Sequence, residues 1–163
     1  MEWLRQIGRL ALLLALQVLL FNRLQIAGCC FPMVYVLFLF NLPARLPRWG
    51  EMLIGFAVGL SMDIWFNSLG VHAAACTAIT FFRPLLLSNL VQEVERISGE
   101  VCSLNIGRIE YIKCVVILTL IHHFIVFSLE AWSLQNWWMI LLQTVGSSIM
   151  TLAVVLGYDF VRK

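Results

Sequence analysis

The sequence predicts an all-α, polytopic membrane protein: a six-helix transmembrane bundle in one domain, residues 1–163. Hydrophobic residues make up 61% of the chain and charged residues only 12%, whereas a typical soluble domain has about 25% charged residues. The mean hydropathy is +0.91. Six apolar blocks fill most of the chain, separated by short breaks. Lipid is therefore the expected solvent for most side chains, and the net charge of +2 gives no reason to expect nucleic-acid binding.

The six apolar blocks define the expected spans. They cover about 3–25, 29–42, 50–66, 69–90, 111–132 and 137–160. The apolar centre of the first block, Leu10 to Phe21, measures roughly 18 Å as a helix, which is short for a hydrocarbon core of about 30 Å. It crosses only if Trp3 lies in the interface and Arg9 extends to it. The alternative is that the first two blocks form a shallow hairpin, which leaves the orientation of the other spans unchanged.

The basic residues predict the orientation of the chain. With six spans both termini lie on one side of the membrane, and ten of the eleven Lys and Arg residues fall on that side. Only Arg23 falls on the other side. Because basic residues are concentrated in cytoplasmic loops, we expect both termini in the cytoplasm. The ten residues are Arg5, Arg9, Arg45, Arg48, Arg83, Arg96, Arg108, Lys113, Arg162 and Lys163.

Loop lengths indicate how the spans pack. Only Asn67 and Ser68 separate the third span from the fourth, so these two helices are expected to form an antiparallel hairpin. The longest connection covers about 88–110, on the cytoplasmic side. Leu90, Val94 and Ile97 lie there at helical spacing, which predicts a short amphipathic helix on the inner membrane surface.

A patterned stretch joins the third and fourth spans. Gly55 and Gly59 lie eight and four residues before Asp63, on its helix face, and Gly70 follows. Small residues let helices approach closely in a membrane, and an intramembrane carboxylate needs a partner or a function. Two interpretations stay open for Asp63: a carboxylate hydrated by the outer headgroups, or a buried anchor bonded to another helix or to a partner protein. Gly55, Gly59, Asp63 and Gly70 are the candidate partner-binding or helix-packing residues.

Two further polar features lie inside the apolar blocks. His122 and His123 lie in the fifth span at a depth similar to that of Asp63. Asp63 and His122 are a candidate polar pair, which could serve as a proton relay or metal site. Adjacent histidines point about 100° apart, so structural hydrogen bonding is the competing interpretation. Arg83 precedes Pro84 near the inner end of the fourth span and could extend to the inner headgroups.

Nothing in the sequence predicts an enzyme. The five cysteines have no metal-ligand spacing, and no serine lies in a nucleophilic arrangement. Phosphate-binding and metal-binding motifs are not found in the sequence. We therefore expect no catalytic residues, no metal and no cofactor.

The patterned stretch resembles the signature of the rod shape-determining protein MreD family. The residues that carry it are Gly55-x-x-x-Gly59-x-x-x-Asp63 and Ser68-Leu69-Gly70-Val-x-Ala73. Phe31-Pro32, the break at Pro43 and the short spans are also similar to that family. Ile121-His122-His123-Phe124, leading to Leu129-Glu130-Ala131, resembles MreD proteins of the Bacteroidetes type. The similarity covers about 10–160 but does not include the connection 88–110.

The resemblance implies a non-enzymatic, multi-pass subunit of the bacterial cell-elongation machinery in the inner (plasma) membrane. Its implied partner is MreC, a single-span protein with a periplasmic domain. The wider assembly would include the MreB filament, a RodA-type glycosyltransferase and a class B penicillin-binding protein, all supporting peptidoglycan synthesis. Membrane lipid is a further expected partner, and self-association into a homo-oligomer stays open.

Two other functions stay open as alternatives. The first is the substrate-binding subunit of an energy-coupling-factor vitamin importer, a fold that the MreD family is thought to share. Ala11-x-x-x-Ala15 resembles the docking motif of those subunits. A rich polar lining for a vitamin is missing, because the outer ends of the spans offer only Asp63, Asn67, His72 and Glu130 and the outer loops are too short to cap a ligand. The second is a proton-coupled transporter that uses Asp63 and His122.

The orientation can be tested with reporter fusions. Fusions at Ser68 and Gln135 should report the outside, and fusions at Gly99 and Lys163 the cytoplasm, because the basic residues flank the latter two. Paired alkaline phosphatase and fluorescent-protein reporters measure this directly. A cytoplasmic signal at Ser68 would contradict the predicted orientation.

Overall fold

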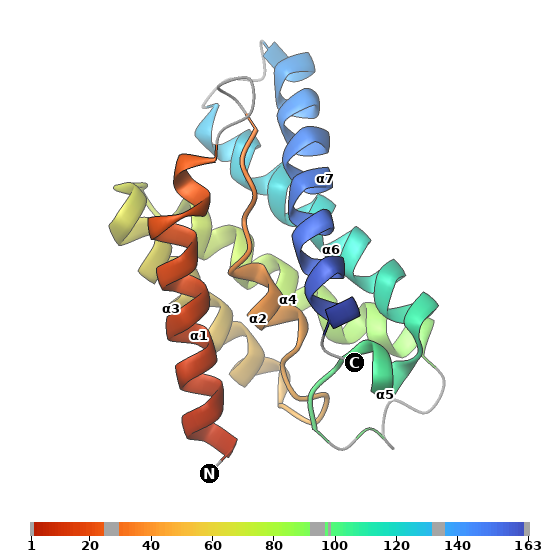
Figure 1. Cartoon of the computed structure of the whole chain (residues 1–163). Helices are drawn as coiled ribbons and strands as arrows, with labels where there is room; N and C mark the ends of the chain where they lie inside the picture. Colours follow the sequence, from red (N-terminus) through yellow and green to blue (C-terminus); the bar gives the residue numbers. More distant parts are fainter. Residues whose placement is uncertain (1, 25–29, 92–96, 98, 132–135, 162–163) are drawn as a thin grey trace.

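The computed structural model describes residues 2–24, 30–91, 97, 99–131 and 136–161. These parts are helical apart from connecting segments, which confirms the all-α prediction for them (Figure 1). The long helices are α1 (Glu2–Leu19), α3 (Arg48–Phe66), α4 (Val71–Leu90), α6 (Arg108–Glu130) and α7 (Trp137–Val161). The short ones are the 3-10 turn η1 (Phe21–Arg23), α2 (Val36–Phe40) and α5 (Ser103–Ile106).

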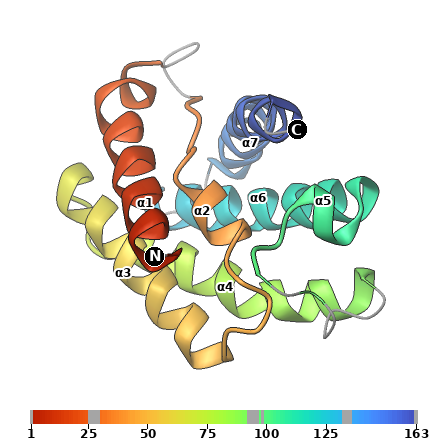
Figure 2. The ribbon, with the colours of Figure 1, turned by 60° about the horizontal axis from the view of Figure 1, so that its bottom comes forward.

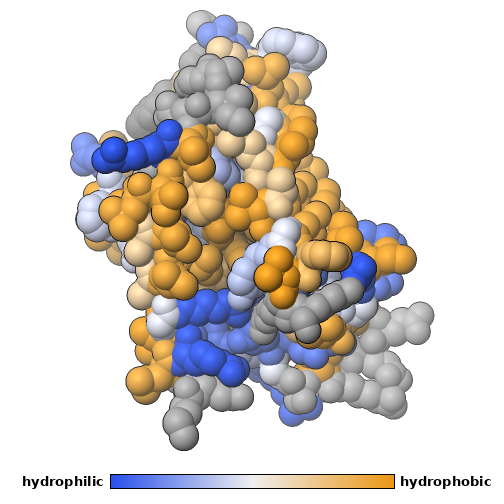
Figure 3. All heavy atoms as spheres, in the orientation of Figure 1, coloured by the Kyte–Doolittle hydropathy of each residue, from blue (hydrophilic) through white to orange (hydrophobic). Residues whose placement is uncertain are grey.

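Three of these helices are long and apolar enough to cross a membrane, namely α4, α6 and α7. They have 20, 23 and 25 residues, and about 20 residues are needed to cross a hydrocarbon core of about 30 Å. Large apolar side chains also face outward, for example Ile64, Leu69 and Val161, which are 75%, 88% and 83% exposed. Figure 3 shows hydrophobic side chains over the visible faces of α1 and α7, and hydrophilic ones near the N-terminal end of α1. The three apolar helices and these exposed apolar side chains indicate a protein that contacts lipid.

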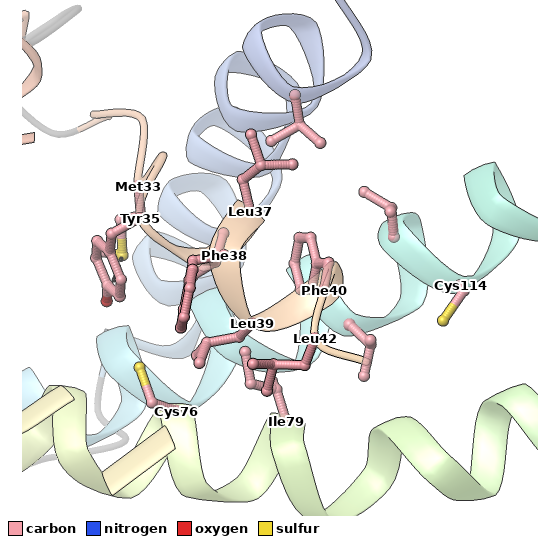
Figure 4. Close-up of a cluster of buried hydrophobic side chains, with 14 of the residues drawn as sticks. Met33, Tyr35, Leu37, Phe38, Leu39, Phe40, Leu42, Cys76, Ile79 and Cys114 are labelled. Atoms are coloured by element: carbon pink, nitrogen blue, oxygen red, sulfur yellow. Dashed lines mark hydrogen bonds between the residues drawn. The ribbon is translucent and has the colours of Figure 1, made fainter. Parts of the chain in front are cut away.

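The helices surround a central segment of the chain. α3 and α4 form the expected antiparallel hairpin, α4 packs on α6, and α6 packs on α7. Figure 2 shows α2 in the middle of the molecule, with the long helices arranged around it. Every residue from Pro32 to Leu42 is buried. The close-up in Figure 4 shows Tyr35, Phe38, Leu39 and other side chains of this segment packed against α4 and α6.

The prediction of a long helix over 29–42 is wrong. In the described part of that range, residues 30–35 are not helical, and α2 has only five residues. Pro32 lacks the N–H that an α-helix requires, and neighbouring helices offer polar side chains that bind the backbone instead. Irregular backbone is tolerated at membrane depth where it is buried in protein.

Side chains from α1 and α7 satisfy the backbone before α2. Gln17 of α1 is fully buried; its Nε2 donates to the Pro32 carbonyl over 2.9 Å, and its Oε1 accepts from the Val34 N–H over 2.6 Å. From α7, the Thr151 hydroxyl accepts from the Met33 N–H over 3.0 Å, and the Ser147 hydroxyl accepts from the Phe31 N–H over 3.2 Å. The two helices thus supply the bonds that a continuous helix would have made within itself.

Arg83 of α4 satisfies the other end of α2. Its Nε donates to the Phe40 carbonyl over 3.1 Å, and its Nη2 donates to the Leu42 carbonyl. Its Nη1 is paired with Glu51 of α3 at 2.9 Å, and both side chains are almost completely buried. The sequence suggested that Arg83 could extend to the inner headgroups, but the structure buries its side chain in the protein. The carbonyls at a helix C-terminus have no partner within the helix, and a planar guanidinium can bind several acceptors at once.

A second ion pair closes the end of the molecule where the N-terminus lies. Arg9 of α1 is paired with Glu100 at 2.8 Å, and the Gln6 amide also donates to Glu100. The loop that carries Glu100 bonds the segment after α2, through the N–H of Ala44 to the Gly99 carbonyl and the N–H of Val101 to the Leu42 carbonyl. The amphipathic helix predicted at 90–97 lies mostly outside the described residues.

Arg83 should be among the most sensitive residues for stability. Arg83→Leu leaves the Glu51 carboxylate and the Phe40 carbonyl buried without the bonds from Arg83, whereas the Leu42 carbonyl keeps the Val101 N–H. We expect this change to lower the free energy of unfolding by about 3–5 kcal/mol. Arg83→Lys keeps the charge but not the three directed bonds, so its loss should be smaller. Thermal unfolding in detergent measures both effects.

The matched control is Arg108→Leu on the exposed start of α6, which should change stability by less than about 0.5 kcal/mol. Equal unfolding temperatures for Arg83→Leu and Arg108→Leu would contradict the bonding described for Arg83.

Candidate functional site

The two predicted glycines form the contact between α3 and α4. A Cβ on Gly59 would lie 2.5 Å from the Cα of Ala73, and a Cβ on Gly55 would lie 2.6 Å from Oγ1 of Thr80 and 2.8 Å from the Cys76 carbonyl oxygen. No side chain fits at either position without moving the α4 backbone. Gly55 and Gly59 are therefore packing residues within the chain, and their face is not exposed to a partner.

Asp63 binds the start of α4. It is 4% exposed, and its two carboxylate oxygens accept from the backbone N–H groups of His72 and Ala73, each over 2.9 Å. The Ser68 hydroxyl donates to the same carboxylate. The first N–H groups of a helix have no partner within it, and the helix dipole favours a negative charge there. Asp63 is thus an anchor bonded to another helix of the same chain.

Gly70 does not belong to this packing contact. No atom outside its immediate neighbourhood lies within 4 Å of where its Cβ would be. Its φ is +82°, in the left-handed region that favours glycine, and Asn67 at the other end of the turn has a φ of +54°. Gly70 therefore allows the short turn that lets Asp63 reach the start of α4.

A buried polar cluster, the Tyr35 cluster, lies on the inner side of this turn. It consists of Tyr35, His72, Cys76 and His122. The Tyr35 hydroxyl lies 3.0 Å from Nδ1 of His72 and 3.0 Å from Nε2 of His122. The sulfur of Cys76 is 3.8 Å from the same Nε2. All four residues are at most 1% exposed.

The hydrogen-bonding capacity of Tyr35 constrains the two imidazoles of the Tyr35 cluster. A phenolic hydroxyl can donate one bond, to one of the two ring nitrogens or to the Met33 sulfur at 3.9 Å, and it can accept from a ring N–H. Nε2 of His72 and Nδ1 of His122 have no partner among the described residues. A proton passed from one ring to the other through Tyr35 would leave an imidazolium and an imidazolate, because the outer nitrogens have no group with which to exchange a proton. The geometry therefore supports structural hydrogen bonding in this cluster.

Asp63 and His122, predicted as a polar pair, do not bond each other directly. Asp63 bonds the backbone of His72, and the connection to His122 continues through the His72 ring and Tyr35. His123 points elsewhere: its Nδ1 bonds the Thr119 carbonyl over 2.9 Å and its Nε2 bonds Thr151 over 3.2 Å. His122 thus bonds the central segment directly through Tyr35, whereas His123 is linked to it through Thr151, whose hydroxyl also bonds the Met33 N–H. Within the described residues no group of three His, Cys, Asp or Glu side chains could hold a metal ion.

The outer surface of the α3–α4 hairpin carries an apolar groove, which we call the hairpin groove. Its volume is about 590 Å³. Gly70, Ala74 and Ala78 lie along it at intervals of four residues, and Phe56, Leu60, Phe81 and Phe82 are among its larger side chains. Small residues at this spacing let a second helix approach closely in a membrane.

Comparison with known proteins gives no relative from which a role could be transferred. No protein-family model, no curated protein and no solved structure matches the chain.

The sequence reasoning missed Tyr35, Glu51 and Gln17. Glu51 had a detectable signal. In an antiparallel hairpin with a short turn, paired positions are about equally far from the turn, and Glu51 and Arg83 each lie sixteen residues from Asn67. Gln17 is a lone amide in an apolar block, which predicts a polar partner but not which one. Tyr35 had no such signal, because its role depends on where the chain leaves the helical path.

The packing contact predicts a contrast between glycines. Gly59→Ala should lower the free energy of unfolding by about 1–3 kcal/mol, because the new methyl group meets the α4 backbone. Gly157→Ala on α7 has no neighbour within 4 Å and should be neutral or stabilising by about 0.5–1 kcal/mol. Thermal unfolding of the two variants in the same detergent checks this, and equal effects would show that α3 and α4 do not meet at Gly59.

Proposed function

We propose that the chain is a non-enzymatic, multi-pass subunit of the bacterial cell-elongation machinery, of the MreD type. It would lie in the inner membrane with six crossings and both termini in the cytoplasm. Its direct partner would be a single-span protein of the MreC type. MreB, a RodA-type glycosyltransferase and a class B penicillin-binding protein would belong to the same assembly.

One observation carries this proposal. The residues that resemble the MreD signature build the α3–α4 hairpin. Gly55 and Gly59 set its spacing, and Asp63 fixes the start of α4. The outer face of that hairpin bears the hairpin groove, which is apolar and has small residues in register. A signature that shapes a helix-docking surface supports a subunit that acts by binding within the bilayer.

The same architecture is compatible with the six proposed crossings, although only α4, α6 and α7 among the described helices are long and apolar enough to span by themselves. α1, α3, α4, α6 and α7 would each cross once, and residues 30–42 would cross as extended chain plus α2. Such a crossing is compatible with the bilayer because its backbone is bonded by Gln17, Arg83, Ser147 and Thr151.

One observation favours the importer alternative. A cavity of about 370 Å³ lies between the end of α6 and the start of α7, where Glu130, Asn136 and Gln143 are its polar lining residues. A small polar ligand would fit chemically. Uptake of a vitamin by cells that contain only this protein and an energy-coupling module would support this alternative over the elongation subunit.

The proposal is tested by co-purification with the MreC-type protein. Ala74 is exposed in the hairpin groove, and Ala74→Leu should reduce the amount of co-purified partner by roughly tenfold, which corresponds to about 1.4 kcal/mol of packing. Cells that depend on this variant should lose their rod shape.

The matched control is Ala153→Leu on the exposed face of α7, which should bind the partner normally. Ala15→Leu tests the other small-residue face, on α1, where Ala11 and Ala15 are exposed. Loss of the partner with Ala15→Leu alone would show that the partner contacts α1 and not the hairpin groove. Normal binding by all three variants would contradict the proposal.

A further inference from the structure

The outer face of α3 is apolar over most of its length. The exposed residues between Trp49 and Trp65 are all hydrophobic, namely Leu53, Phe56, Ala57, Leu60 and Ile64. The two acids of the helix are bonded within the protein: Glu51 belongs to the buried ion pair with α4, and Asp63 bonds the start of α4. The partly exposed Ser61 hydroxyl donates to a carbonyl of its own helix over 2.8 Å. Lipid beside α3 would therefore meet no unsatisfied polar side chain on this face.

This face is continuous with a surface that contacts lipid. α3 packs along α4, which is one of the helices long and apolar enough to cross a membrane. Phe81, Phe82 and Leu85 on the outer side of α4 are 51%, 38% and 50% exposed. A helix that packs along α4 and has an apolar outer face borders the same lipid, because its charges are satisfied inside the protein.

An exposed tryptophan lies at each end of the apolar face of α3. Trp49 and Trp65 are each 68% exposed. Tryptophan is enriched where the hydrocarbon meets the headgroups, because its ring is apolar and its N–H needs a polar partner. The two residues are sixteen positions apart in the helix, which corresponds to about 24 Å. This separation is shorter than a typical hydrocarbon core of about 30 Å.

α7 has a similar pair of aromatic residues that lie farther apart. Trp138 near its start is 68% exposed, and Tyr158 near its end is 42% exposed. They are twenty positions apart, or about 30 Å of helix. The exposed residues between them carry no polar side chain: Met139, Leu141, Leu142, Val145, Ile149, Ala153 and Gly157. A long apolar stretch fits a thin core by tilting, and Figure 2 shows the axis of α7 at an angle to that of α3.

The two aromatic pairs face the same two membrane surfaces. Figure 1 shows α4 and α6 running in opposite directions, and Tyr35 accordingly bonds both His72 at the start of α4 and His122 in the second half of α6. α3 therefore ends, and α7 begins, at the same side of the molecule. Trp65 lies toward the same surface as Trp138, and the other two aromatic residues lie toward the opposite surface.

We propose that Trp49 and Trp65 fix α3 in a bilayer whose hydrocarbon core is about 24 Å thick beside this helix, and that the protein binds phospholipids with short acyl chains there in preference to long ones. A core of about 30 Å would enclose at least one of the two indole N–H groups without a polar partner. Bilayers thin locally around a helix that is too short for them, and lipids with short chains need the least deformation. The inference rests on the proposed crossing of α3 but not on the proposed partner.

Quenching of tryptophan fluorescence by brominated lipid tests this. A variant that keeps Trp65 and has phenylalanine in place of the other five tryptophans is reconstituted into equal mixtures of dimyristoleoyl- and dierucoyl-phosphatidylcholine. Either lipid is brominated in turn, and each signal is referenced to vesicles of that brominated lipid alone. The short-chain lipid should be enriched around Trp65 by roughly threefold or more.

The matched control keeps Trp138 as its single tryptophan. Because α7 can change its tilt, we expect nearly equal quenching by the two lipids there. Equal quenching at Trp65, or enrichment of the long-chain lipid, would overturn the thin core, and equal enrichment at Trp65 and Trp138 would overturn the anchoring by α3. Absence of quenching at Trp65 by either lipid would show that α3 does not face the bilayer.

The wild-type protein decides the matter where the variant with a single tryptophan does not fold. It should unfold at a higher temperature in dimyristoleoyl- than in dierucoyl-phosphatidylcholine vesicles, and an equal or lower unfolding temperature would overturn the proposal. Co-purification of the MreC-type protein is measured separately. Loss of that partner with the lipid preference intact would contradict the proposed function alone.

Discussion

The backbone of residues 31–42 has to be satisfied without water, and much of the polar chemistry of this protein serves that requirement. A buried N–H or carbonyl without a partner costs about 1–3 kcal/mol, so several such groups together would exceed the net stability of many proteins. Gln17, Ser147 and Thr151 bond the groups before α2, and Arg83 bonds those after it. The side chains come from helices that are far apart in sequence. The central segment therefore fixes the position of α1, α4 and α7 at the same time.

The α3–α4 hairpin determines where Arg83 lies. Asp63 holds the first N–H groups of α4, and the left-handed turn at Gly70 brings the two helices into one register. Gly59 and Gly55 then allow contact along that register, and Glu51 meets Arg83 further down the hairpin. A charge buried at this depth is tolerated only with a partner and well-placed acceptors. The turn, the glycines and the ion pair together place the Arg83 guanidinium where it can donate to the carbonyl at the end of α2.

The sequence could predict those features that depend on the spacing of apolar and small residues or on contacts between residues close in the chain. The α3–α4 hairpin followed from a two-residue break between apolar blocks, and the helix-packing interpretation of Gly55 and Gly59 followed from their spacing to Asp63. The break in the second block was missed because the uninterrupted apolar run from Met33 to Phe40 fits a buried helix as well as a buried irregular segment. The irregular conformation is stabilised by Gln17 and Thr151, which lie more than ten and more than a hundred residues away in the chain. No local pattern contains that information.

The state of the central segment also bears on the kind of function that this fold suits. In transporters, discontinuous helices leave their ends free, so that helix termini and unwound carbonyls bind the substrate or the coupling ion. Here the end of α2 is occupied by Arg83, and the segment before it is occupied by Gln17 and Thr151. A substrate could bind there only by displacing bonds that the fold itself requires. The Tyr35 cluster has orphan ring nitrogens at His72 and His122, yet Tyr35 links the two rings and Cys76 contacts one of them. The backbone groups of the central segment are thus used within the fold, which supports the proposed packing role over transport. A binding partner would then contact the outer surfaces of the helices and not the centre of the molecule.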